Sequence, residues 1–261
     1  WLRLPVVLNK GVNDFLFPCG RGRLRAQLTA PAASVMLDTH DTTLPDLIAG
    51  ETEPLWGAIV VVNATTAWMD GLVIRASFPD AQFMTSGVPP LPPLAVQKVP
   101  FRFPAFVPED AKTTEVPLTV ELGENRAATW RSVNKTSVSI GVRQPDERHK
   151  RTFISNLDGS TQYYAVSPAK PGNAASDRPA LFLTLHGAGV EASGQAAAYA
   201  PKTWGHVVAP TNRRPYGFDW EEIGRLDAME VLALAQERYE TDPLRTYLTG
   251  HSMGGHGTWQ V

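Results

Sequence analysis

Residues 250–254 read Gly-His-Ser-Met-Gly, the pattern in this sequence that is best suited to chemistry. They follow the apolar run Thr246–Thr249 and precede helix-compatible residues, so a sharp turn from strand to helix is expected. Such a turn raises the hydroxyl of Ser252 above the sheet edge, where it can act as a catalytic nucleophile. The neighbours predicted to support this strained turn are Gly250, His251 and Gly254. The alternative is an ordinary glycine-rich turn in which the serine caps the helix.

Backbone N–H groups that could stabilise an oxyanion are expected at two places. Met253 would begin the helix after the serine, and helix N-termini favour negative charge. Small residues also follow an earlier buried strand, in the segment Leu185–Gly189. Gly187 and Ala188 are therefore predicted to form the oxyanion hole together with Met253. The alternative is a tight turn that requires glycine, with His186 as a packing residue.

The sequence offers no convincing base or acid to activate Ser252. Only nine residues follow it, and they include one histidine, His256, and no carboxylate. His251 and His256 are interpreted as packing or supporting residues, and Asp227 as a structural carboxylate near a helix start. The catalytic acid and histidine are therefore expected beyond residue 261. The 261-residue chain alone is expected to have negligible hydrolase activity, because an unactivated serine is a poor nucleophile.

The elements that must position these residues are strands that alternate with helices after about residue 150. A hairpin is expected around residues 156–159, where Asn-Leu-Asp-Gly separates two strand-like runs. Three apolar runs are typical of strands buried on both faces: 180–185, 206–209 and 246–249. Helical patterns lie between them at about 193–199 and 226–239. This alternation predicts crossover connections and a mainly parallel sheet.

These motifs together resemble the α/β-hydrolase superfamily. The resemblance is closest to esterases and to prolyl-oligopeptidase-like or polyhydroxybutyrate-depolymerase-like hydrolases. It rests on Leu185–Gly189, on Asp227 in the helix before the nucleophile strand, and above all on Thr241–Gly255. It implies a serine hydrolase in which residues 150–261 form the N-terminal half of an α/β-hydrolase domain. In such enzymes the acid and histidine follow the serine, which this sequence does not show.

The first half of the chain is typical of an all-β protein. Short β-branched and apolar runs are separated by Gly, Pro, Asn and Asp, and no long helical period appears. A break is expected between Leu44 and Pro54. Residues 1–50 are therefore interpreted as the C-terminal part of a β-rich domain, and residues 55–148 as an immunoglobulin-like β-sandwich.

Composition excludes several classes of partner and cofactor. The net charge is −2 without a long basic run, which argues against a nucleic-acid partner. No apolar stretch is long enough for a membrane span. Cys19 is the only cysteine, and neither metal-ligand spacing nor a nucleotide-binding glycine motif is present, so no metal and no cofactor are predicted. The sparse cysteine and the sandwich modules favour a secreted or periplasmic protein.

Two functions from different classes remain open. The first is a serine hydrolase for small-molecule or polymer substrates, with esters favoured over peptides and carbohydrate-linked esters suggested by analogy. The second is a non-catalytic carbohydrate- or protein-binding protein with a relic hydrolase domain. Exposed aromatic side chains would support that alternative, and Trp56, Trp68 and Trp130 could form a sugar-stacking platform if they share one face. Packing of these tryptophans in the core is the favoured interpretation.

Overall fold

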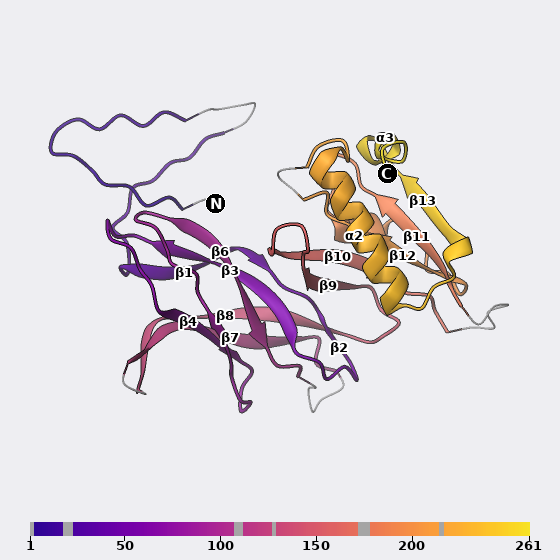
Figure 1. Cartoon of the computed structure of the whole chain (residues 1–261), viewed down its shortest axis with the longest axis horizontal. Helices are drawn as coiled ribbons and strands as arrows, with labels where there is room; N and C mark the ends of the chain where they lie inside the picture. Colours follow the sequence, from indigo (N-terminus) through magenta and orange to yellow (C-terminus); the bar gives the residue numbers. More distant parts are fainter. Residues whose placement is uncertain (1–2, 18–22, 107–111, 127–128, 172–177, 214–216) are drawn as a thin grey trace.

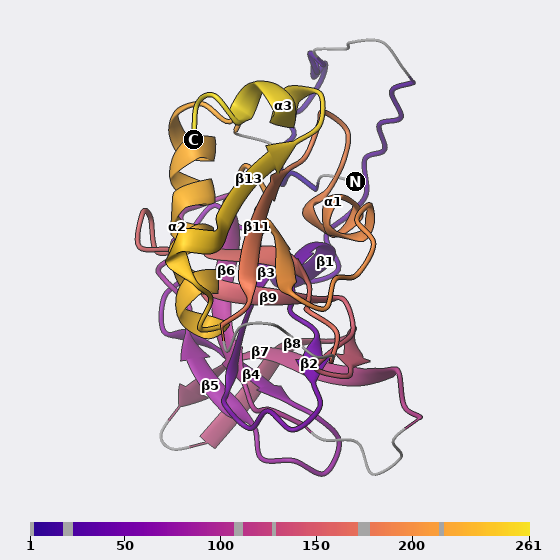
Figure 2. The same ribbon diagram turned by 90° about the vertical axis from the view of Figure 1, so that its right-hand side faces the viewer.

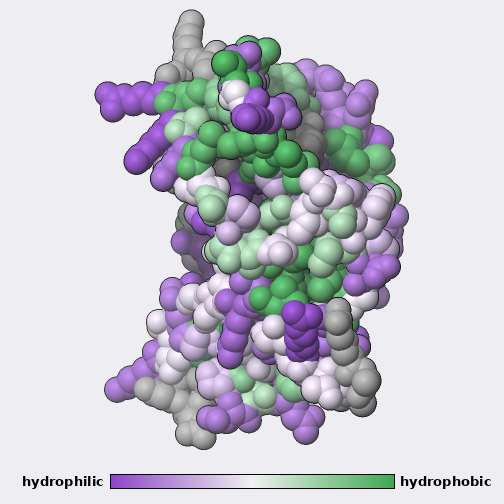
Figure 3. Space-filling view, turned by 90° about the vertical axis from the view of Figure 1, so that its left-hand side faces the viewer, coloured by the Kyte–Doolittle hydropathy of each residue, from purple (hydrophilic) through white to green (hydrophobic). Residues whose placement is uncertain are grey.

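The computed structural model describes residues 3–17, 23–106, 112–126, 129–171, 178–213 and 217–261 (Figure 1). Cys19 lies outside these residues. The described residues before Val35 form no helix or strand, and many of their apolar side chains are exposed. They contribute to the apolar patch in the upper part of Figure 3. The rest of the chain forms two sheets that pack on each other, followed by a third sheet with helices.

The first two sheets are built almost wholly from antiparallel pairs. One sheet has the order β1-β3-β6, from the strands Val35–Thr43, Leu55–Asn63 and Val96–Phe103. The other has the order β2-β8-β7-β4-β5, from the strands Leu47–Ile48, Thr129–Arg143, Glu115–Arg126, Leu72–Ser77 and Met84–Gly87. The short β2 runs parallel to β8, and the remaining neighbours are antiparallel.

Alternating burial explains why these two sheets pack face to face. Leu72, Ile74 and Ala76 on β4 are buried, whereas the residues between them are partly exposed. They share a core with Ile59 and Val61 of the opposite sheet, as expected of a β-sandwich. Strands on both sides of the boundary predicted near residues 44–54 contribute to this one core, because β1 pairs with β3.

The prediction of a mainly parallel α/β-hydrolase sheet for residues 150–261 is wrong. The sheet is mixed and has the order β13-β11-β12-β10-β9, from Thr246–Gly250, Ala180–Leu185, Gly205–Ala209, Thr161–Ser167 and His149–Ile154. Only β13, β11 and β12 are mutually parallel, whereas β10 is antiparallel to both β12 and β9. The short loop between β9 and β10 forces antiparallel pairing, since a parallel pair needs a long crossover.

Helices are few among the described residues, so the predicted helix-rich α/β-hydrolase arrangement of residues 150–261 is wrong in this respect as well. They are α1 (Ala192–Ala197), α2 (Glu222–Arg238), the 3-10 turn η1 (Pro243–Arg245) and α3 (Met253–Gly257). The long helix α2 covers one face of the mixed sheet, and α1 lies against the other face (Figure 2). None of the helices described is long and apolar enough to cross a membrane.

Candidate active site

Ser252 lies on a sharp turn between β13 and α3. Its backbone has φ 53° and ψ −119°, a left-handed conformation that a residue with a side chain rarely adopts. Such strain costs about 1–3 kcal/mol and persists only where the surrounding structure imposes it. The serine is exposed to solvent. The turn therefore presents the Ser252 side chain at the end of the strand, as the nucleophile pattern requires.

Two glycines make this turn sterically possible. A Cβ atom on Gly250 would lie 2.1 Å from the carbonyl oxygen of Gly254. A Cβ atom on Gly254 would lie 1.9 Å from the carbonyl oxygen of Leu185. Both separations are far below van der Waals contact, so neither position accepts a side chain without movement. The start of α3 is thus pressed directly against the end of β11.

The fold brings the two predicted oxyanion segments together. Because β11 and β13 are parallel and Leu185 pairs with Gly250, the loops that follow these strands emerge at the same edge of the sheet. The N–H of His251 donates to the carbonyl of Leu185 at 3.2 Å. A Cβ atom on Gly187 would lie 3.2 Å from the Cβ of Ser252. Gly187 therefore borders the serine.

The remaining predicted oxyanion residues also lie in this loop pair. Met253 is the first residue of α3, a position whose N–H has no partner within a helix. Ala188 is exposed beside the buried Gly187. The three predicted oxyanion residues thus lie at the two chain segments that meet at this edge of the sheet.

The histidines do not complete a catalytic triad. Within the described part of the chain, no histidine side chain forms a hydrogen bond with Ser252. His251 and His256 are exposed, and the Nε2 atom of His256 lies 3.8 Å from a carboxylate oxygen of Glu221. His186 is buried, and its ring nitrogens lie 3.0 Å from two carbonyl oxygens. Of these three histidines, only His186 is buried, and its ring contacts backbone carbonyl oxygens.

Asp227 lies in a buried ionic network behind the site. Its carboxylate accepts from the N–H groups of Thr211 and Asn212 at 3.2 and 3.0 Å, and it pairs with Nε of Arg213 at 3.0 Å. Desolvation by burial raises the pKa of Asp227, against the opposing effect of the Arg213 charge and the N–H donors. Arg213 also pairs with Glu230. Sequence reasoning missed this role of Arg213, because an arginine after a strand usually faces solvent.

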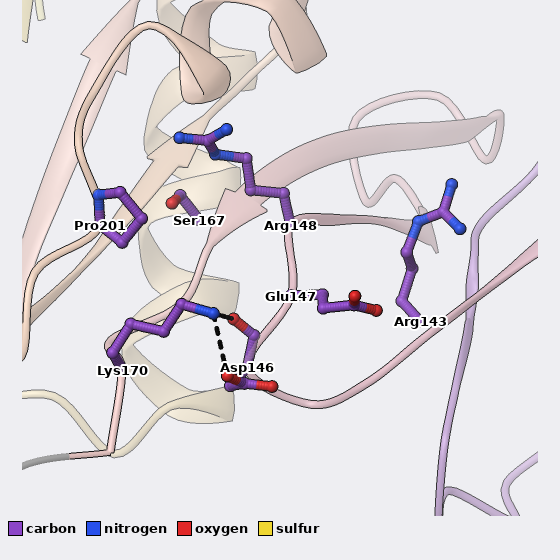
Figure 4. Close-up of a pocket in the computed structure, with 7 residues that line it drawn as sticks. All are labelled: Arg143, Asp146, Glu147, Arg148, Ser167, Lys170 and Pro201. Carbon is purple, nitrogen blue, oxygen red and sulfur yellow. Dashed lines mark hydrogen bonds and ion pairs between the residues drawn. The ribbon is translucent and has the colours of Figure 1, made fainter. Parts of the chain in front are cut away.

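The structure also contains a charged cavity of about 340 Å³ (Figure 4). Its lining residues are Arg143, Asp146, Glu147, Arg148, Ser167, Lys170 and Pro201. The Lys170 ammonium points at Asp146 and pairs with it at 2.9 Å. No residue of the Ser252 turn lines this cavity. Within the described ranges, no group of three or more His, Cys, Asp or Glu side chains is placed to hold a metal ion.

The three tryptophans suggested as a binding platform do not line one sheet face. Trp56 is on β3 and Trp130 is on β8, in different sheets, whereas Trp68 is exposed in the loop between β3 and β4. The Arg75 guanidinium lies 3.8 Å from the ring centroid of Trp130. A Cβ atom on Gly123 would lie 2.5 Å from the same indole, so the ring packs between these two residues.

Comparisons with known proteins give matches to solved structures but not to families or curated sequences. No family model matches the chain, and no curated protein matches it by sequence. A solved structure of a thermostable esterase is 19% identical, with a TM-score of 0.35, covering 87% of this chain and 72% of that one. The sporulation control protein Spo0M from Bacillus subtilis is 10% identical, with a TM-score of 0.27, covering 52% of this chain and 68% of that one. Since both scores are below 0.5, the functional argument rests on the local geometry.

Proposed function

We propose that this protein is a serine hydrolase that cleaves ester bonds through an acyl-serine intermediate. The observation that carries the proposal is the left-handed conformation of Ser252, next to Gly187 and directly before α3. A structural serine would have little reason to occupy a strained, exposed turn that requires two crowded glycines. A nucleophile needs this placement, because its hydroxyl must meet a carbonyl carbon above the sheet edge.

In the proposed reaction, the Oγ atom of Ser252 attacks the ester carbonyl carbon while a base accepts the hydroxyl proton. The carbonyl oxygen becomes an oxyanion, which accepts hydrogen bonds from the N–H of Met253 and from the Gly187–Ala188 loop. Collapse of the tetrahedral intermediate breaks the bond to the alcohol, which leaves with the proton. Water then hydrolyses the acyl-serine and regenerates the hydroxyl.

The base and the acid in this proposal are residues beyond position 261. Two observations near Ser252 support this part of the proposal. None of the described histidines forms a hydrogen bond with Ser252, and the carboxylate of Asp227 is paired with Arg213. Esters are favoured over peptides, since an alkoxide is a better leaving group than an amide nitrogen. Ser252 and Ala188 are exposed, which suits a substrate that approaches from the surface.

The test is labelling with a fluorophosphonate probe, using the protein as its gene encodes it and mass spectrometry to locate the label. Ser252 should be labelled, and Ser252→Ala should abolish labelling. Ser132→Ala, at an exposed position on β8, should have no effect. A folded wild-type protein that takes up no label at Ser252 would overturn the proposal.

A further inference from the structure

We infer that Trp220 is a positioning residue for the proposed reaction, and that it acts by orienting the peptide group that carries the Gly187 N–H. This inference rests on the proposed function. Trp220 is fully buried, and its indole Nε1–H donates to the carbonyl oxygen of His186 at 3.1 Å. That carbonyl and the Gly187 N–H belong to the same peptide group. In a trans peptide they point in opposite directions, so a bond that fixes the carbonyl also fixes the N–H.

The next peptide group is held in the same way. The carbonyl oxygen of Gly187, which shares a peptide group with the N–H of Ala188, accepts the N–H of Val190 at 3.3 Å. Nδ1 of His186 lies 3.0 Å from the same oxygen, and Nε2 lies 3.0 Å from the carbonyl oxygen of Thr211; a neutral imidazole has one N–H and donates to one of these two carbonyls. The two consecutive N–H groups predicted to bind the oxyanion are thus both anchored at their carbonyl ends. A hydrogen bond to a carbonyl also polarises the peptide and strengthens its N–H as a donor.

Trp220 also contacts the helix on the other side of the nucleophile. A Cβ atom on Gly257 would lie 2.5 Å from Cδ1 and Cγ of the indole, so the ring packs against the backbone of α3. The indole and the His186 ring form an edge-on pair with centroids 5.0 Å apart. One buried side chain therefore sets the separation between the Gly187 loop and the helix that begins at Met253.

The backbone at Trp220 is itself strained. Its φ is 62°, and the preceding Asp219 has a φ of 51°, both in the left-handed region. Such strain persists only where the surrounding structure imposes it, and here the buried indole is held between the His186 carbonyl and α3.

The test replaces Trp220 by Phe, which keeps an aromatic ring and removes the N–H donor. We expect roughly tenfold slower fluorophosphonate labelling and a similar fall in kcat on a p-nitrophenyl ester, with KM unchanged. Loss of a direct oxyanion donor costs about 10²–10³ in kcat, and an indirect effect should be smaller. The KM should not move, because the oxyanion forms only after the substrate has bound.

The control is Trp259→Phe, because Trp259 lies two residues beyond the end of the same short helix but is 89% exposed. It should leave labelling and kcat unchanged. If Trp220→Phe fails to fold, β-(3-benzothienyl)alanine at position 220 supplies the second variant, since it keeps the bicyclic shape and replaces N–H by sulfur. Failure of the wild type to label would overturn the proposed function and this inference with it. Normal labelling of both the wild type and a folded position-220 variant would overturn this inference alone.

Discussion

Ser252 and its neighbouring glycines show how much of a site can depend on the absence of side chains. Gly250 and Gly254 face carbonyl oxygens at distances that no Cβ atom tolerates, whereas a Cβ on Gly255 would meet its nearest neighbour at 3.8 Å. The three glycines are close in sequence but differ completely in steric freedom. Alanine substitutions at Gly254 and at Gly255 therefore form a matched pair of variants.

Gly254→Ala should lower the free energy of unfolding by about 2–3 kcal/mol, because overpacking forces α3 away from β11. The same change should also reduce fluorophosphonate labelling, since Ser252 moves with the helix. Gly255→Ala should leave stability unchanged or raise it by up to about 1 kcal/mol, because alanine is the better helix former. Urea unfolding of both variants provides the measurement. Equal stability of the two variants would contradict the packing described for Gly254.

Gly187→Ala should impair the nucleophile without unfolding the protein. The new methyl group would lie 3.2 Å from the Cβ of Ser252, so one of the two loops must shift by a few tenths of an ångström. We expect labelling to slow about tenfold or more, since misplacement of reacting groups is costly. Gly194→Ala on α1, where the nearest atom is at 3.5 Å, serves as the control. Unaltered labelling of Gly187→Ala would show that the loop does not border the reacting atoms.

At the scale of elements, the Asp227–Arg213 pair connects α2 to the loop after β12. Asp227 is fully buried on α2, and its partners Thr211, Asn212 and Arg213 follow the end of β12. The network fixes Thr211, whose carbonyl lies 3.0 Å from the His186 ring. The position of the Gly187 loop therefore depends in part on a carboxylate that contacts no substrate.

Asp227→Asn should lower the free energy of unfolding by about 1–3 kcal/mol, because Arg213 loses its most deeply buried carboxylate partner and keeps only Asp158 and Glu230. Glu237→Gln, an exposed change on the same helix, should shift it by less than about 0.5 kcal/mol. Urea unfolding curves measure both effects. A loss under 1 kcal/mol for Asp227→Asn would argue against the pair.

At the scale of the whole molecule, the sandwich and the mixed sheet meet at a charged and aromatic junction. The carboxylate of Glu51, after β2, pairs with Arg151 on β9 and with Arg238 on α2. Desolvation raises the pKa of Glu51, but its hydrogen bonds and ion pairs with the two arginines outweigh this and lower it. His206 stacks on Tyr239 beside this group, with ring centroids 4.6 Å apart.

The junction should make the protein less stable in acid. Burial, and to a smaller degree the neighbouring His149, lower the pKa of His206 from 6.5 to about 4. Its Nδ1 accepts the N–H of Ala169 at 3.2 Å, which only the neutral ring can do. The unfolded chain therefore binds a proton between pH 6.5 and 4 that the folded protein excludes, and stability falls as the pH drops through this window.

The expected loss is about 1–3 kcal/mol by pH 4, after discounting for the partial exposure of the ring. Urea unfolding at pH 7.5 and at pH 4.5 measures the change. His206→Gln should reduce the loss of unfolding free energy between these two pH values, whereas His256→Gln, at an exposed position, should not. If His206→Gln loses as much stability as the wild type between these pH values, then other groups take up the proton.

The local pattern was sufficient to predict the Ser252 turn. Glycine on both sides, a preceding strand and a following helix are short-range features, and they are sterically coupled within a few residues. The strands at 180–185 and 206–209 were also predictable, because continuous apolar runs report burial on both faces. A strand also forms at 246–250, but the prediction that it is buried on both faces is wrong, because β13 lies at the edge of the sheet and its Tyr247 and Leu248 side chains are exposed.

The mixed arrangement of the last sheet was decided only by the tertiary structure. The hairpin β9–β10 could be predicted locally, but its docking against β12 depends on contacts between residues 40 to 44 positions apart, from Ser167 with Val207 to Ala165 with Ala209. The same holds for the contact of Trp220 with the His186 carbonyl, 34 positions away. The sequence by itself determined the position of the candidate nucleophile, because the conformation of this turn depends on backbone sterics within a few residues. Only the fold decided which buried groups hold its surroundings in place, because pairing between distant segments leaves no periodic signal in the chain.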